Sequence, residues 1–108
     1  MPSRTYPLVV VHAAQLLGAQ VRGGRMERGW TIAELAERAG VAEKTVRKVE
    51  QGDPRVALGT AFDCAVLVGV PLYYDDERRL AAEADRGRAP LIGKRVRPPA
   101  PPETDLDF

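Results

Sequence analysis

The stretch TIAELAERAGVAEKTVRKVEQG, residues 31–52, decides the fold of this chain of 108 residues. It starts with the pattern of a capping box, in which Thr31 is the N-cap and Glu34 follows three residues later. Apolar residues then recur at helical spacing up to Gly40, and glycine commonly ends a helix. The pattern predicts a short amphipathic helix followed by a tight glycine turn.

A second short helix is predicted from about Ala42 to Gln51, and Gly52 is placed to end it. Val46 and Val49 have the spacing of core residues. The charged residues of the same helix face outward: Glu43, Lys44, Arg47 and Lys48. Two short helices around such a turn are the sequence form of a helix-turn-helix, whose second helix enters the major groove of DNA.

Three more helices are predicted, at about residues 9–28, 58–68 and 77–88. The segment 58–68 is nearly apolar all round, so we expect it at the centre of the core, with Cys64 buried. Glycines at 18, 23 and 24 weaken the helical pattern of the first segment, by about 1 kcal/mol each relative to alanine. The predicted fold class is therefore all-α, with five helices in a domain of residues 9–89 after a short arm of residues 1–8.

From residue 90 the composition changes to a proline-rich segment, for which we predict a flexible, disordered tail over residues 90–108. The tail contains a basic cluster and ends with an acidic stretch that carries two large apolar residues. One interpretation is an inert, solubilising end. The other is a partner-binding segment that uses Lys94, Arg95, Arg97, Leu106 and Phe108.

The overall composition restricts the function classes. The formal net charge is only +1, so an argument for nucleic-acid binding must come from the placement of charges. A single cysteine excludes an internal disulfide and a cysteine-based metal cluster. We find no catalytic constellation, metal motif or cofactor fingerprint, and therefore expect neither an enzyme nor a cofactor. No membrane-spanning segment is visible, and we expect a cytoplasmic, nucleoid-associated protein.

The residues that recur at fixed spacing over about residues 17–73 resemble the Cro/cI-type helix-turn-helix family, also called the XRE family and lambda repressor-like. The resemblance rests on Arg25, Leu35–Ala36, Gly40–Val41, Thr45–Val46, Val49–Gly52 and Gly69–Leu72. It implies a DNA-binding protein that acts as a homodimer on an inverted-repeat operator of double-stranded DNA. It also implies an ion pair between Arg25 and Glu50 that ties the first helix to the third.

The same resemblance, together with the placement of the cations, suggests the contacts to DNA. Base edges would be read by Glu43, Lys44, Arg47 and Lys48. Phosphates would be held by Arg22, Arg25, Thr31, Thr45 and Arg55. The chain departs from the family pattern at Ile32, where members often carry glutamine, and at Ala42, which offers no capping oxygen and so costs about 1 kcal/mol. A third departure is Glu43, which puts a negative charge near the groove.

A narrower resemblance covers residues 52–79 and the tail, which are similar to HipB-type antitoxins. It implies a HipA-like kinase toxin as a partner and repression of the chain's own operon. Two alternatives stay open: a stand-alone XRE-family regulator without a toxin, and a protein-interaction module that does not bind DNA. For the dimer surface, the candidates are Leu72, Tyr73, Tyr74 and the fifth helix.

Overall fold

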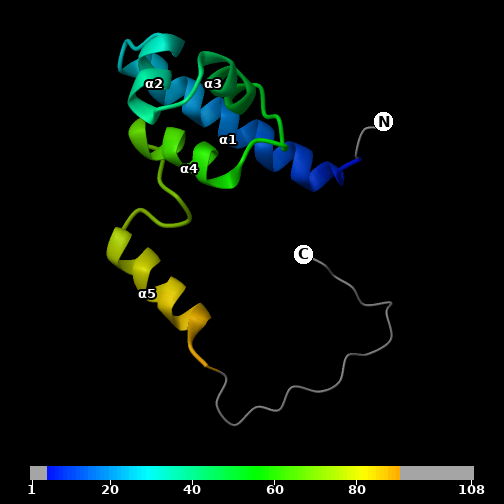
Figure 1. The fold of residues 1–108 in the computed structure, drawn as a ribbon. Helices are drawn as coiled ribbons and strands as arrows, with labels where there is room; N and C mark the ends of the chain where they lie inside the picture. Colours follow the sequence, from blue (N-terminus) through cyan, green and yellow to red (C-terminus); the bar gives the residue numbers. More distant parts are fainter. Residues whose placement is uncertain (1–4, 91–108) are drawn as a thin grey trace.

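The computed structural model describes residues 5–90, which form five α-helices and no strand. The helices are α1 (Leu8–Glu27), α2 (Ile32–Ala39), α3 (Glu43–Glu50), α4 (Leu58–Leu67) and α5 (Glu77–Arg88) (Figure 1). The predicted all-α fold class with five helices is confirmed. The tail residues singled out above, Lys94, Arg95, Arg97, Leu106 and Phe108, lie outside the described residues.

One hydrophobic core joins the first four helices. The long helix α1 packs against α3 and α4, and α2 packs against the same two helices. The buried core residues are Val21, Leu35, Ala36, Val46, Val49, Cys64, Ala65 and Val68. Cys64 is buried as predicted, and burial raises the pKa of its thiol.

The start and end of α2 follow the sequence signals. The Thr31 hydroxyl accepts a hydrogen bond from the Glu34 amide at 3.0 Å, and the Glu34 carboxylate accepts one from the Thr31 amide at 2.8 Å. The predicted capping box is thus confirmed. Gly40 follows the helix with φ of 70°, a left-handed conformation that glycine adopts without a steric penalty. Ala42 precedes α3 without a side-chain cap, as expected from its lack of an oxygen.

The glycines that weaken the predicted first helix differ in what surrounds them. A Cβ atom on Gly18 would lie 2.4 Å from the Val49 carbonyl oxygen, and one on Gly24 would lie 2.5 Å from the Val68 carbonyl oxygen. A Cβ atom on Gly23 would meet nothing within 4 Å. Gly18 and Gly24 therefore let α1 approach the backbone of the neighbouring elements closely, which the sequence pattern alone does not reveal.

The fourth helix contributes to the core as expected, but one side of it is exposed. Cys64 and Ala65 are fully buried, but the side chains of Leu58 and Val66 are 67% and 58% exposed. The physical reason is that α1 and α2 cover only part of α4. The remaining side of α4 would be buried only if a fifth helix packed closely on it.

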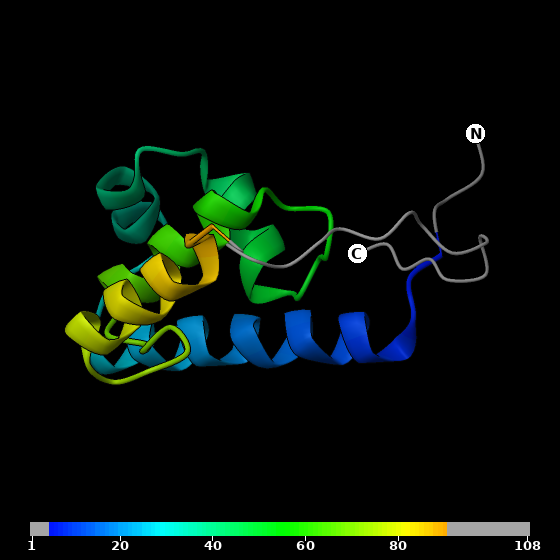
Figure 2. The same cartoon turned by 90° about the horizontal axis from the view of Figure 1, so that it is seen from below.

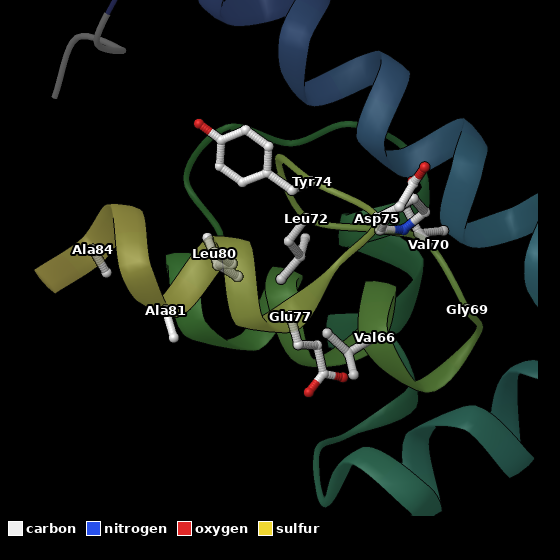
Figure 3. A pocket seen from close by; sticks show the side chains of 11 residues that line it. Val66, Gly69, Val70, Leu72, Tyr74, Asp75, Glu77, Leu80, Ala81 and Ala84 are labelled. Atoms are coloured by element: carbon white, nitrogen blue, oxygen red, sulfur yellow. The ribbon is translucent and has the colours of Figure 1, made fainter. Parts of the chain in front are cut away.

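Helix α5 stands apart from the other four helices (Figure 1) and contributes no buried residue. Its start is capped by Asp76, whose carboxylate accepts a hydrogen bond from the Arg78 amide at 2.9 Å. Between α5 and the end of α4 lies an open cavity of about 710 Å³, lined by Val66, Leu72 and Leu80 among others (Figure 3). Within residues 5–90, none of the helices has the length and apolar character needed to cross a membrane.

Candidate nucleic-acid interface

The exposed side of α3 carries the four charged residues that the sequence places there: Glu43, Lys44, Arg47 and Lys48. The opposite side of the helix is anchored by Val46 and Val49, which are 0% and 4% exposed. Because α1 and α2 both pack against α3, the short helix is held firmly and its charged side is presented to solvent. A helix with this arrangement can enter a DNA groove without rearrangement of the core.

A bidentate ion pair fixes the end of α3 to the end of α1. The Arg25 guanidinium donates from Nε and Nη2 to the two carboxylate oxygens of Glu50, at 2.6 and 2.9 Å. Its Nη1 donates to the Trp30 carbonyl oxygen at 2.9 Å. The two side chains are only 12% and 7% exposed, and the hydrogen bond with Glu50 raises the pKa of Arg25. These contacts give Arg25 a positioning role, and the phosphate contact suggested for it stays a prediction.

A second ion pair lies along the exposed side of α3. The Arg47 guanidinium donates to the Glu43 carboxylate at 3.3 Å, with both side chains about half exposed. Such an exposed pair at i, i+4 spacing contributes about 0.3–0.5 kcal/mol, so DNA could displace it at little cost. In the sequence, the two residues lie four positions apart, which is the spacing at which such pairs form on a helix.

Next to α3, polar side chains from three elements surround an open pocket of about 410 Å³. It brings together Thr45 and Arg55, two of the suggested phosphate contacts, with Lys48, one of the suggested base readers. Thr60, at the start of α4, lines the same pocket and was missed in the sequence. Hydroxyl, ammonium and guanidinium groups in one pocket are the donors that a phosphate group accepts from.

The charge of Arg55 is partly balanced within this pocket. Its Nε and Nη2 atoms donate to the Asp53 carboxylate at 3.0 and 3.1 Å. The hydrogen bonds from Arg55 lower the pKa of Asp53, and the nearby Lys48 lowers it further. With two cations and one anion, the pocket keeps a net positive charge.

Like Arg25, the two remaining suggested phosphate contacts lie outside this pocket. Arg22 is exposed on α1, and Thr31 is exposed at the N-cap of α2. Neither lines the polar pocket. The structure therefore gathers part of the suggested phosphate set beside α3 and leaves the rest on the two preceding helices.

Trp30, which precedes the capping box, is held in place by two arginines. The Arg38 guanidinium carbon lies 4.1 Å from the centre of the indole ring and that of Arg28 lies 5.7 Å from it. Arg28 also donates from Nη1 to the Val68 carbonyl oxygen at 2.6 Å. The ring is half-buried against the core. These cation–π contacts favour a structural role for Trp30 over stacking on a nucleobase.

Comparison with known proteins agrees with this geometry. The model of a family described as "Helix-turn-helix domain" matches residues 16–81, more than half of the chain. The match runs from the middle of α1 to the first half of α5. No curated protein and no solved structure matches the chain.

Proposed function

Since the chain belongs to the helix-turn-helix domain family, we propose that it is a sequence-specific DNA-binding repressor that reads an inverted-repeat operator with α3. The family membership points to a DNA-binding transcriptional regulator. The observation that best supports the proposal is the exposed charged side of α3, which is held in place by the buried ion pair between Arg25 and Glu50. A helix meant to read bases needs this combination of exposed donors and a fixed backbone.

The chemistry of the side chains divides the contacts. Lys44 and Arg47 can donate to the O6 and N7 atoms of guanine, and Glu43 can accept from the N4 amino group of cytosine. Lys48 lines the polar pocket with Arg55, and we therefore assign it to a phosphate rather than to a base. A dimer would place a second α3 one turn of DNA away, about 34 Å, which multiplies the specificity of a single short helix.

The test of this proposal compares binding to specific and non-specific DNA. In vitro selection from random duplexes would supply the operator, and fluorescence anisotropy would then give the affinity over a series of salt concentrations. The affinity should fall steeply as the salt concentration rises. In a plot of the logarithm of the binding constant against the logarithm of the salt concentration, the slope should be about −0.9 per phosphate contacted. Arg47→Ala should weaken operator binding by about 1–3 kcal/mol and leave non-specific binding nearly unchanged.

The matched control is Arg86→Ala, because Arg86 is an exposed arginine on α5 that also forms an ion pair with a glutamate of its own helix. It should change neither affinity. Equal losses of specific and non-specific affinity in Arg47→Ala would refute its role as a base reader. A chain that selects no sequence and binds DNA without a salt dependence would refute the proposed function as a whole.

A finer proposal is that the chain is the antitoxin of a HipA-like kinase and represses their common operon. Its support is the resemblance of residues 52–79 and of the tail to HipB-type antitoxins. A tagged full chain should retain a kinase from its native host in stoichiometric amount, and a version ending at Ala89 should lose it if the tail makes the contact. Recovery of operator DNA without such a protein would leave an autonomous regulator.

A further inference from the structure

The outer side of α1 is an apolar helix face that no other helix covers. In Figure 2, α1 runs along one edge of the domain, and the other helices all lie on the same side of it. At helical spacing, the uncovered side presents Val9, His12, Ala13, Leu16 and Gln20, which we call the outer α1 face. The side chains of Val9 and Leu16 are 73% and 62% exposed. A monomer rarely leaves large aliphatic side chains in such a row without a binding role.

The lack of charge on this helix is a second observation. No aspartate, glutamate, lysine or arginine occurs in residues 8–21, although charged residues make up 29% of the chain. A surface helix of a globular protein normally carries charges on its solvent side, and a helix that is uncharged all round is normally buried. The first four turns of α1 therefore have the sequence of a helix covered on both sides.

The apolar surface continues from the outer α1 face onto α4. An open groove of about 410 Å³ lies beside it and is lined by Ala13 from the face itself, by Val10 and by Leu58 and Phe62 from α4. Leu58 is 67% exposed. The first two turns of α1, up to residue 15, also precede the part of the chain that matches the family. Val9, His12 and Ala13 of the outer α1 face thus lie before the matched part, and Leu16 and Gln20 lie within it.

The composition of the surface indicates what covers it. In a two-fold dimer each patch meets an identical patch, so any charge at the centre faces a like charge. The outer α1 face carries no acidic or basic residue other than His12 and can meet itself without such repulsion. Helix α5, the alternative dimer surface, lines the cavity beside α4 with its apolar residues Leu80, Ala81 and Ala84, and most of its other positions are charged. Charge depletion is also what distinguishes the core of an interface from the rest of a surface.

We propose that the outer α1 face is the surface through which two copies of this chain form a homodimer, with their α1 helices antiparallel. A two-fold axis between Ala13 and Leu16 places Leu16 of one copy over the small Ala13 of its partner. The same axis places Val9 opposite Gln20 of the partner. Leu16 then packs against a small side chain and Val9 against an uncharged one, which allows the two helices to pack closely.

The inference deepens the proposed function, since it rests on the expectation that two α3 helices act on one operator. Sedimentation velocity of the full chain, at several concentrations and without DNA, tests it. The wild type should be a dimer. Leu16→Glu should be a monomer with unchanged helix content, because each copy then buries a carboxylate beside the partner's Ala13. We expect the dimer dissociation constant to rise about a hundredfold or more.

The matched control is Leu80→Glu on α5, which should remain a dimer. Gln20→Glu adds the same charge to the outer α1 face without removing an apolar side chain. It should also dissociate the dimer, so the test holds even if Leu16→Glu folds poorly. A monomeric wild type, a dimeric Gln20→Glu variant or a monomeric Leu80→Glu variant would each overturn the proposal.

DNA binding by the same proteins separates the two proposals. A wild type that dimerises but selects no DNA sequence would refute the proposed repressor and leave the α1 interface intact. A monomeric wild type that binds an operator would refute the α1 interface and leave DNA recognition intact.

Discussion

Replacing Gly18 with alanine should loosen the attachment of α3, whereas replacing Gly23 should stabilise the protein. Alanine is favoured over glycine inside a helix by about 1 kcal/mol, and this gain applies to both substitutions. At Gly18 the new Cβ atom would lie 2.4 Å from the Val49 carbonyl oxygen and 2.8 Å from that of Glu50, whereas ordinary contacts begin at 3.4 Å. Backbone atoms cannot rotate away, so α1 and α3 would have to separate by about 1 Å.

Overpacking of this kind costs about 1–3 kcal/mol, and a clash with two backbone carbonyls belongs at the upper end. The net expectation is a loss of about 2 kcal/mol for Gly18→Ala against a gain of about 1 kcal/mol for Gly23→Ala. For a domain of this size, the melting temperatures should differ by more than about 10 °C.

The assay is urea unfolding followed by far-ultraviolet circular dichroism, with the free energy of unfolding taken from the midpoint and slope. The two variants share the same helix and the same chemical change, so the difference between them isolates the close approach of α1 to α3. Midpoints for Gly18→Ala and Gly23→Ala that agree within error would refute this reasoning. If α3 reads the operator as proposed, operator binding should weaken only in Gly18→Ala, because its clash displaces the end of α3.

Two further predictions concern the charged groups that hold α3 and the loop after it. Glu50→Ala should cost about 3 kcal/mol of unfolding free energy, because it leaves the largely buried charge of Arg25 without its carboxylate partner. A chemical denaturation series checks this, and a loss below about 1 kcal/mol would contradict it. The pKa of Asp53 lies below its ordinary value of 3.8 because Arg55 donates hydrogen bonds to it. Its stabilising effect is therefore present above pH 3.8 and lost as the pH falls through the lower folded-state pKa. An acid titration should show this loss in the wild type, and an Asp53→Asn variant that shows the same loss would argue against it.

Local signals in the sequence were sufficient to predict most of the fold. The structure contains the predicted capping box at Thr31, the glycine after α2 and the core valines of α3. These features were predictable because each depends on residues only a few positions apart. The long-range ion pair between Arg25 and Glu50 could not be derived from spacing. It came from the resemblance to the Cro/cI-type family, and the structure contains it.

Features that depend on the packing of distant elements were missed. The exposure of Leu58 and Val66 follows from the position of α5, which has no buried residue and leaves one side of α4 uncovered. Neither helix reveals this by its own periodicity. The place of Thr60 in the polar pocket beside α3 could not be predicted from the sequence, because Thr60 belongs to α4 and Lys48 to α3. Which residues touch DNA stays a prediction.

The position of the only tryptophan determines what optical measurements of this protein will report. Trp30 contacts two guanidinium groups at the junction of α1 and α2, so its emission will change when that junction opens. Helix α5 shares no buried residue with the junction and contains no tryptophan. Melting of α5 should therefore be visible as an early loss of ellipticity with no change in fluorescence. The two signals should coincide only for the four-helix core, and the gap between them would measure how independently the fifth helix unfolds.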